Sequence, residues 1–186
     1  MGDPAIFLDR DGVINVSPGQ GYVRSWSEFA FLAESREAIR DLSQAGYRLF
    51  IISNQSGVGQ GLYTHDALND LTTRMLAAIH HAGGKIDAVM YCTHQETDRC
   101  ACRKPQRGLI DQIRRQHAVD LAGSYVIGDD SKDIVLGQTI GCRTVLVLSG
   151  RTPSGAAAQL QPPPDYLCQD LRAAADWILA QRDLLA

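Results

Sequence analysis

Short apolar runs alternate with amphipathic helical patterns from one end of the chain to the other. This alternation restricts the fold to the α/β class, because strand–helix–strand units place their strands in parallel and cover both faces with helices. We therefore predict a central parallel sheet between two helical layers. The expected strands cover residues 5–8, 47–52, 86–91, 124–127, 144–148 and 165–167. The expected helices cover residues 34–45, 64–82, 109–117 and 171–180, with one more ending near residue 140.

Length and composition indicate one soluble folding unit. A chain of 186 residues can build one sizeable core but has little room for two, so we expect one domain spanning residues 1–186. No run approaches the roughly 18 apolar residues of a membrane span, and the first residues lack a signal peptide. We therefore expect a cytoplasmic protein that uses no membrane. The net charge of -3 argues against a basic face for nucleic acid.

Polar side chains follow the expected strands where ligands bind in such folds, beyond the carboxyl ends of the strands. Asp9, Ser53 and Asp129 each close an apolar run, and Lys104 lies in a loop after another run. Any one of them alone would usually be a solvated turn residue. Four such positions converging on one edge favour phosphate chemistry.

Asp9 and Asp11 form the strongest local feature of the sequence. They are two positions apart at the end of an expected strand, so both carboxylates lie in one small site. An aspartate, with a reference pKa of about 3.9, is ionised at neutral pH and can attack phosphorus without a base. Asp11 can then give a proton to the leaving oxygen and later take one from water. The alternative is an acidic turn in which Gly12 bends the chain.

Four segments resemble, in chain order, the four motifs of the haloacid dehalogenase (HAD) superfamily. The match spans residues 5–150. It implies a Rossmann-like HAD fold, and the short chain leaves room only for a minimal cap. The segments are FLDRDGV at 7–13, IISNQSG at 51–57, RKP at 103–105 and GDDSKD at 128–133.

This resemblance implies a role for each motif residue in a magnesium-dependent phosphatase. Asp9 would be the nucleophile and Asp11 the acid and base, while Ser53 and Lys104 would bind the transferring phosphate. Magnesium prefers oxygen ligands and keeps several waters, so a few protein oxygens suffice. Asp9 and Asp129 would supply carboxylates to Mg²⁺, and Asp11 its backbone carbonyl.

A second set of residues has the composition of a structural zinc site. Three thiolates and one imidazole complete a tetrahedral Zn²⁺ shell without an open position. The alternative is a group of free surface cysteines. This zinc loop, residues 92–102, leads directly into the lysine motif and would fix its base. The expected ligands are Cys92, His94, Cys100 and Cys102.

The zinc loop before the Arg-Lys-Pro motif narrows the resemblance to the D-glycero-D-manno-heptose 1,7-bisphosphate phosphatases and the related histidinol-phosphate phosphatases. The loop at residues 54–61 is similar to theirs. Three features depart from the family pattern: residues 104–108 lack the usual second proline, Asp130 replaces a lysine, and residues 17–21 extend the flap.

Substrate contacts are expected from Ser53, Asn54, Arg103, Lys104 and Arg107. A guanidinium offers forked donors for a second phosphate or for sugar hydroxyls. Arg107 could equally be a solvated residue at a helix start.

The sequence leaves two interpretations of Asp133 open. It could orient Lys104 or assist at the metal, or it could be a first-turn helix acid placed by the helix dipole.

The resemblance implies removal of the C7 phosphate from heptose 1,7-bisphosphate in lipopolysaccharide or related glycan precursor synthesis, by a monomeric enzyme. The alternative is a histidinol-phosphate phosphatase, which would use the same machinery. A non-catalytic phosphate-binding module would lack a nucleophile or metal carboxylate, yet all are present. A nucleic-acid end phosphatase would need a basic groove, against 18 basic and 21 acidic residues here.

Overall fold

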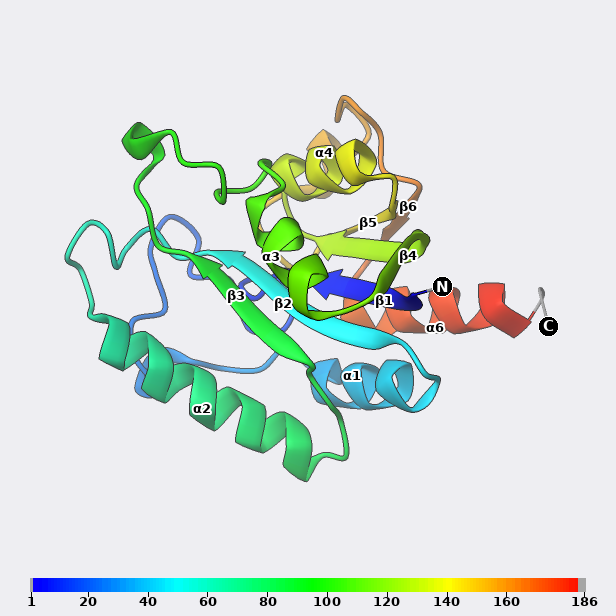
Figure 1. Cartoon of the computed structure of the whole chain (residues 1–186), viewed down its shortest axis with the longest axis horizontal. Helices are drawn as coiled ribbons and strands as arrows, with labels where there is room; N and C mark the ends of the chain where they lie inside the picture. The colour runs from blue at the N-terminus through cyan, green and yellow to red at the C-terminus, as the bar shows by residue number, and fades with distance from the viewer. Residues whose placement is uncertain (1, 184–186) are drawn as a thin grey trace.

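A six-stranded sheet forms the centre of the computed structural model, which describes residues 2–183 (Figure 1). All neighbouring strands are parallel, in the order β3-β2-β1-β4-β5-β6. Residues 1 and 184–186, the ends of the expected domain, lie outside the described residues. The strands are β1 (Asp3–Leu8), β2 (Arg48–Asn54), β3 (Ala88–Cys92), β4 (Val119–Gly128), β5 (Arg143–Val147) and β6 (Tyr166–Cys168). The predicted α/β class and parallel sheet are confirmed.

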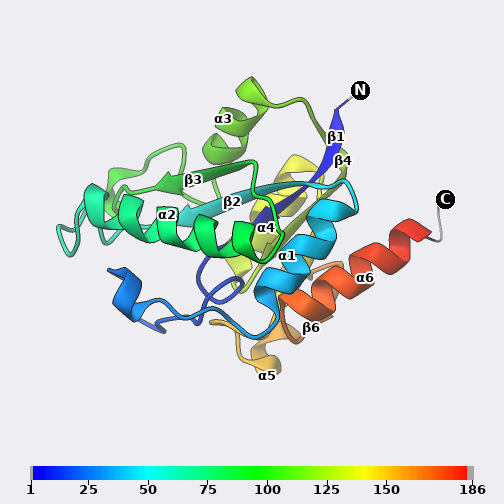
Figure 2. The same cartoon turned by 90° about the horizontal axis from the view of Figure 1, so that it is seen from below.

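Helices cover both faces of the sheet, as the sequence predicts. Figure 2 looks onto the face covered by α1 (Ser35–Gln44), α2 (His65–His81) and α6 (Leu171–Asp183). The opposite face carries α3 (Gly108–Gln116) and α4 (Ser131–Ile140). Residues 152–164 contain the short helix α5 (Ser154–Ala157).

Alternation along the strands explains why two separate core layers form. In β1, Ile6 and Leu8 pack against the helices of one face, while Ala5 and Phe7 pack against those of the other. All four side chains are fully buried, so β1 reads as a continuous apolar run, as strands covered on both faces do.

Two local features define the start of α2 and the end of α1. The Thr64 hydroxyl accepts a hydrogen bond from the Ala67 N–H at 3.1 Å and so caps α2. Gly46 has a φ of 91° just beyond α1, a conformation that glycine adopts at little cost. Within the described residues, we find no helix with the length and hydrophobicity to cross a membrane.

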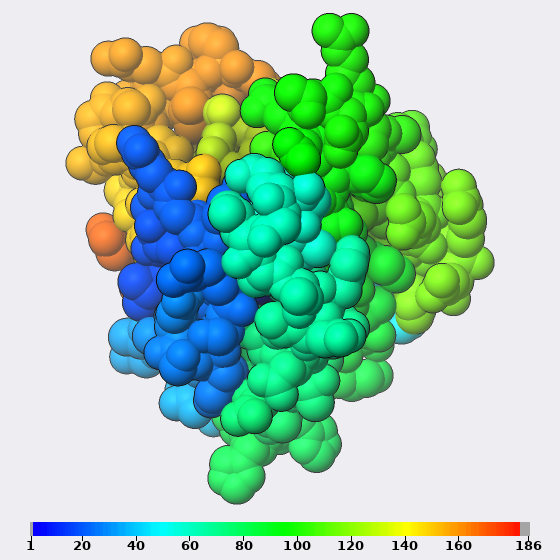
Figure 3. Space-filling view, turned by 90° about the vertical axis from the view of Figure 1, so that its left-hand side faces the viewer, coloured from blue at the N-terminus to red at the C-terminus, as the bar shows by residue number. Residues whose placement is uncertain are grey.

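The loops that follow the strands gather at one end of the molecule. Figure 3 faces this end: the flap after β1 is blue, the loop after β2 is teal and the zinc loop is green. The segment after β5 appears in yellow and orange beside the flap. The carboxyl ends of parallel strands share one edge, so this face receives the side chains that the sequence places after the strands.

Candidate active site

Asp9 and Lys104 form a buried ion pair at the carboxyl end of β1. The Lys104 Nζ lies 3.0 Å from Asp9 Oδ1, 2.7 Å from Asp133 Oδ1 and 2.9 Å from the Ile52 carbonyl. Three acceptors match the three protons of the ammonium group, which is therefore fixed in place. Asp133 is fully buried and holds Lys104, which is the orienting role that the sequence left open.

The pair keeps both members charged despite burial. Burial raises the pKa of Asp9, but Lys104, Lys132 and a Ser53 hydrogen bond outweigh it and leave that pKa below its ordinary value. Burial likewise lowers the pKa of Lys104, and the opposing effects of Asp133 and Asp9 raise it above the ordinary value. The carboxylate of Asp9 is thus available as an anion.

Asp129 follows β4 and lies beside Asp9 with no cation paired to it among the described residues. Burial, followed by the charges of Asp9 and Asp133, raises the pKa of Asp129 to about 7. One oxygen from each of these three carboxylates lies within 4.8 Å of the others. Such crowding of negative charge is stable only when a proton or a cation is added.

The turn after β5 holds Asp129 through its backbone. The Arg151 N–H donates to Asp129 Oδ2 at 2.8 Å, and Thr152 donates to the Asp129 carbonyl through both its N–H and its hydroxyl. A side chain at Gly12 or Gly150 would collide with the Asp129 carboxyl group. Sequence reasoning missed this turn, since backbone donors leave no residue-type signal.

Asp11 is held by three side chains. Arg10, which is fully buried, donates to both carboxylate oxygens at 3.0 Å, and Asn15 and Gln55 add bonds of 2.9 and 3.0 Å. Sequence reasoning assigned no role to Arg10, Asn15 or Gln55, since the partners that give them one lie up to 44 residues away.

The two polar residues at the end of β2 serve different partners. Ser53 is buried and faces Asp9. Asn54 forms a reciprocal amide pair with Lys104: its Nδ2 donates to the Lys104 carbonyl at 3.1 Å and its Oδ1 accepts from the Lys104 N–H at 2.9 Å. Both polar atoms of the Asn54 side chain are therefore already used to dock the lysine segment onto β2.

Most of the predicted site residues line a cavity of about 200 Å³. Arg103 lines it too, and its buried Nη1 has no hydrogen-bond partner within residues 2–183. Arg107 does not line the cavity; its guanidinium is exposed and pairs with Asp111 at 2.9 Å. The predicted lining residues are Asp9, Asp11, Ser53, Asn54, Arg103 and Asp129, joined by the unpredicted Tyr22, Ser56, Asp130, Lys132 and Arg151.

Asp130, which departs from the family pattern, has a partner of its own. Its Oδ2 lies 2.6 Å from Lys132 Nζ, and its Oδ1 accepts from the Lys132 N–H at the start of α4. Lys132, two residues after Asp130, therefore supplies a positive charge at the cavity. The sequence alone could not show that this lysine turns back toward the site.

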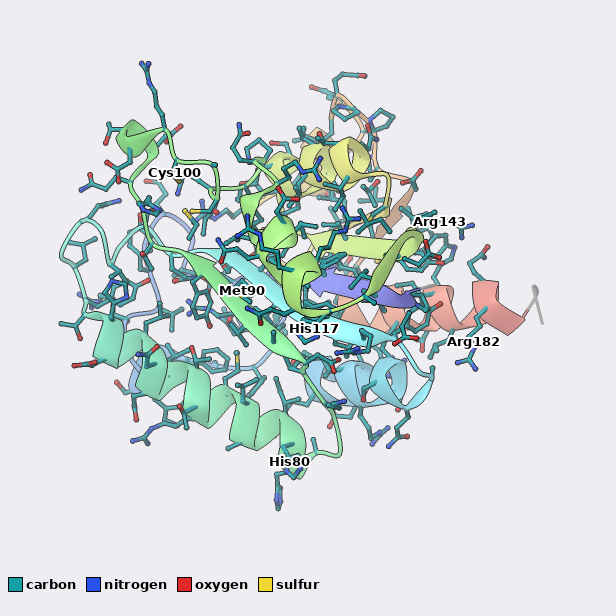
Figure 4. All side chains as sticks on the ribbon, in the orientation of Figure 1. His80, Met90, Cys100, His117, Arg143 and Arg182 are labelled. Atoms are coloured by element: carbon teal, nitrogen blue, oxygen red, sulfur yellow. The ribbon has the colours of Figure 1, made fainter. Side chains whose placement is uncertain are left out.

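The four expected zinc ligands come together where the two ends of the zinc loop meet. Their ligand atoms all lie within 4.8 Å of one another, with contacts of 3.2–3.7 Å between neighbours. A tetrahedron with Zn–S bonds of about 2.3 Å has edges of roughly 3.8 Å, so the set fits zinc. None of the five cysteines forms a disulfide. Figure 4 shows Cys100 at this end of the sheet, far from Arg143 and Arg182 at the opposite end.

Other candidate residues lie away from the site. His80 is exposed and projects into solvent at the end of α2 (Figure 4). A hollow of about 400 Å³ at the opposite end of the sheet, near Tyr47 and Arg143, contains none of the predicted site residues.

Known proteins share this chain's sequence and fold over nearly its full length. The D-glycero-beta-D-manno-heptose-1,7-bisphosphate 7-phosphatase of Bordetella bronchiseptica is 37% identical over 176 residues, which cover 95% of this chain and 98% of the relative. The enzyme of that name from Pseudomonas aeruginosa is 34% identical, over 96% and 99%. The chain belongs to the heptose bisphosphate phosphatase family. A family model described as HAD-hydrolase-like also matches residues 101–174.

Solved structures of the heptose bisphosphate phosphatase family agree with this assignment. The crystal structure of the B. bronchiseptica D,D-heptose 1,7-bisphosphate phosphatase, complexed with magnesium and phosphate, has a TM-score of 0.86 and 36% identity. The matched region covers 96% of this chain and 99% of the B. bronchiseptica chain. The corresponding enzyme from Burkholderia thailandensis has a TM-score of 0.68 and 32% identity, over 95% and 99% of the two chains.

The carboxylate cluster fits a magnesium ion. Asp9 and Asp129 are hard oxygen donors at the edge of a polar cavity. Burial, and then the charges of Asp9 and Asp133, raise the pKa of Asp129, and a divalent cation would balance that negative charge. Asp133 completes the three-carboxylate group but does not line the cavity, whereas Asp9 and Asp129 do, so these two are better placed to bind the ion.

Proposed function

We propose that this chain removes the C7 phosphate of D-glycero-β-D-manno-heptose 1,7-bisphosphate. The observation that carries the proposal is the convergence of Asp9, Asp11, Ser53 and Asp129 on one cavity with Lys104 buried behind it. The relatives that are about one third identical over nearly the whole chain bear this activity in their names.

Asp9 is the nucleophile in the proposed reaction, and Asp11 moves the proton. The Asp9 carboxylate forms a bond to phosphorus while the bond between phosphorus and the C7 oxygen breaks, and Asp11 protonates that oxygen. Water then attacks the aspartyl phosphate, gives its proton to Asp11 and releases inorganic phosphate. The Ser53 hydroxyl donates to an equatorial oxygen during both transfers, while Lys104, whose three protons are held by protein acceptors, stabilises the negative charge through its own charge from behind Asp9.

Magnesium and zinc have separate roles in this proposal. Asp9, Asp129 and the Asp11 backbone carbonyl would hold magnesium, which offsets the repulsion between the nucleophile and the phosphate. Cys92, His94, Cys100 and Cys102 would hold a structural zinc that fixes the base of the loop before Lys104.

The substrate has a direct test. Phosphate release with magnesium should be measured for the heptose 1,7-bisphosphate and for histidinol phosphate. We expect kcat/KM to favour the bisphosphate by about 100-fold, or about 2.7 kcal/mol. The reverse preference would assign the chain to the histidinol phosphatases, and no turnover of either would reject both substrate classes.

Arg103 is the proposed contact for the second phosphate. Its Nη1 is a buried donor without a partner among the described residues, and its side chain lies between the 200 Å³ cavity and an adjoining hollow of about 550 Å³. A half-buried guanidinium with one unpaired buried nitrogen, beside open space, suits an anionic group of the substrate distant from the reacting phosphate.

The Arg103→Met variant should therefore discriminate between substrates. We expect kcat/KM for the bisphosphate to fall about 30-fold, the loss of a charge-assisted hydrogen bond, and for histidinol phosphate to fall less than about threefold. Arg107→Met, which removes an exposed pair, is the matched control and should change neither by more than about twofold. Equal losses with both substrates would show that Arg103 contacts the transferring phosphate instead.

A further inference from the structure

Gln55 is fully buried behind the cavity and bonds two of the catalytic groups at once. Its Nε2 donates to Asp11 Oδ2 at 3.0 Å and to Ser53 Oγ at 3.1 Å. Its backbone N–H donates to the Cys92 carbonyl at 2.7 Å, which ties the residue to the end of β3. The side chain therefore has little freedom to move independently of the sheet.

Tyr63 determines which way the Gln55 amide faces. The Tyr63 hydroxyl donates to Gln55 Oε1 at 2.7 Å, and burial, the largest influence, raises the pKa of this phenol, so it remains a donor. With the amide reversed, its oxygen would face the Asp11 carboxylate and its NH₂ group would face the phenol proton. The observed orientation is the one in which every member has a complementary partner.

This orientation sets the direction of the Ser53 hydrogen bonds. Because Ser53 Oγ accepts from Gln55, its own proton is free to point toward Asp9 and the transferring phosphate. A hydroxyl that directs its proton toward the cavity has the polarity that a phosphate oxygen requires.

The same amide fixes the Asp11 carboxylate. Asp11 Oδ1 accepts from Arg10 Nε, Arg10 Nη2 and Asn15 Nδ2, at 3.2, 3.0 and 2.9 Å. Among the described residues, Asp11 Oδ2 accepts only from Arg10 Nη2 and Gln55, both at 3.0 Å. Oδ2 has fewer donors and is the oxygen better able to exchange a proton, and Gln55 is the contact that aims it.

We propose that Gln55, oriented by Tyr63, is a positioning residue that aligns the proton-transferring oxygen of Asp11 and keeps Ser53 a donor toward phosphate. This inference rests on the proposed phosphatase function. The contact with Ser53 affects every phosphate ester alike, whereas the contact with Asp11 affects proton transfer, so the inference predicts a loss that grows with the help that the leaving group needs.

Two substrates with different leaving groups test the role. An alkoxide must be protonated as it leaves, whereas 4-nitrophenolate leaves readily without a proton. The alkyl substrate is whichever of heptose 1,7-bisphosphate and histidinol phosphate the wild type hydrolyses faster. In Gln55→Met, kcat/KM should fall about 100-fold for the alkyl substrate and less than about tenfold for 4-nitrophenyl phosphate, with KM little changed.

Two further variants complete the design. Tyr63→Phe keeps the amide but removes the group that orients it, so it should give a smaller loss in the same direction, about fivefold for the alkyl substrate. It also keeps the test decisive if Gln55→Met does not fold. Gln112→Met makes the same exchange at an exposed position of α3 and should leave both rates unchanged.

Each remaining outcome has a definite meaning. Equal losses with both substrates in Gln55→Met and Tyr63→Phe would show that the network only supports the fold, which overturns the inference. Unchanged rates in both variants would overturn it too. If the wild type hydrolyses neither alkyl substrate, the proposed function fails, and the inference fails with it.

Discussion

Asp9→Asn should abolish phosphate release while the protein remains folded. An amide cannot attack phosphorus as a carboxylate does, so we expect kcat to fall by about 10⁵-fold, as when other enzymes lose a nucleophile. The fold should survive because Asn has nearly the same shape and Lys104 keeps its pair with Asp133 at 2.7 Å. Phosphate release and thermal unfolding of the same preparation measure both properties.

The control for this variant lies on the same strand. Asp3→Asn makes the identical exchange at the exposed start of β1, where the carboxylate is 3.7 Å from Arg48, and should retain full activity. Asp9→Ala guards against recovery of a carboxylate by deamidation. Turnover above about 1% of wild type in Asp9→Ala would mean that water, rather than Asp9, attacks the phosphate.

Cys100→Ala should release zinc and loosen the segment that presents Lys104. Zinc content should fall from about one per chain to near none, because a tetrahedral site with three ligands binds far less tightly. Cys102 directly precedes Arg103 and Lys104, so disorder in the zinc loop reaches the ammonium group. Since a misplacement of about 1 Å can cost about 100-fold in rate, we expect kcat to fall between about tenfold and 100-fold.

The loss should be partial because Lys104 has a second attachment. The Asn54 amide pair holds its backbone independently of zinc. Cys142→Ala is the matched control, since it removes a buried thiol outside the zinc loop and should lower stability by about 1 kcal/mol with zinc retained. Full zinc content in Cys100→Ala would exclude this residue as a ligand; zinc loss with unchanged kcat would separate the zinc loop from catalysis.

The sequence predicted the sheet well because its strands are covered on both faces and appear as plain apolar runs. β4 is the exception, as it begins at Val119 rather than at residue 124. Its first part carries Asp120 and Gly123 and pairs with Asp3 and Pro4 across a register shift, which no alternation rule reveals. The short helix α5 was not predicted, because four residues are too few to show a helical period.

The site was predictable where chemistry depends on residue type and order. Asp9, Ser53, Lys104 and Asp129 come together as the motif resemblance implies. The supporting contacts were not predictable, because they depend on three-dimensional pairing. Arg10, for example, is fully buried against Asp11, although an arginine in a sequence ordinarily suggests a solvated charge.

The reciprocal pairing of Asn54 with the Lys104 backbone bears on how this enzyme family can diversify. Together with the cysteines at residues 100 and 102, it anchors the zinc loop close to its carboxyl end. The exposed turn at Glu96–Asp98 lies outside these anchors yet borders the hollow next to Arg103. Insertions and deletions in that turn can therefore reshape the walls of this hollow while the reacting groups keep their places, so the surroundings of the site can evolve separately from its chemistry.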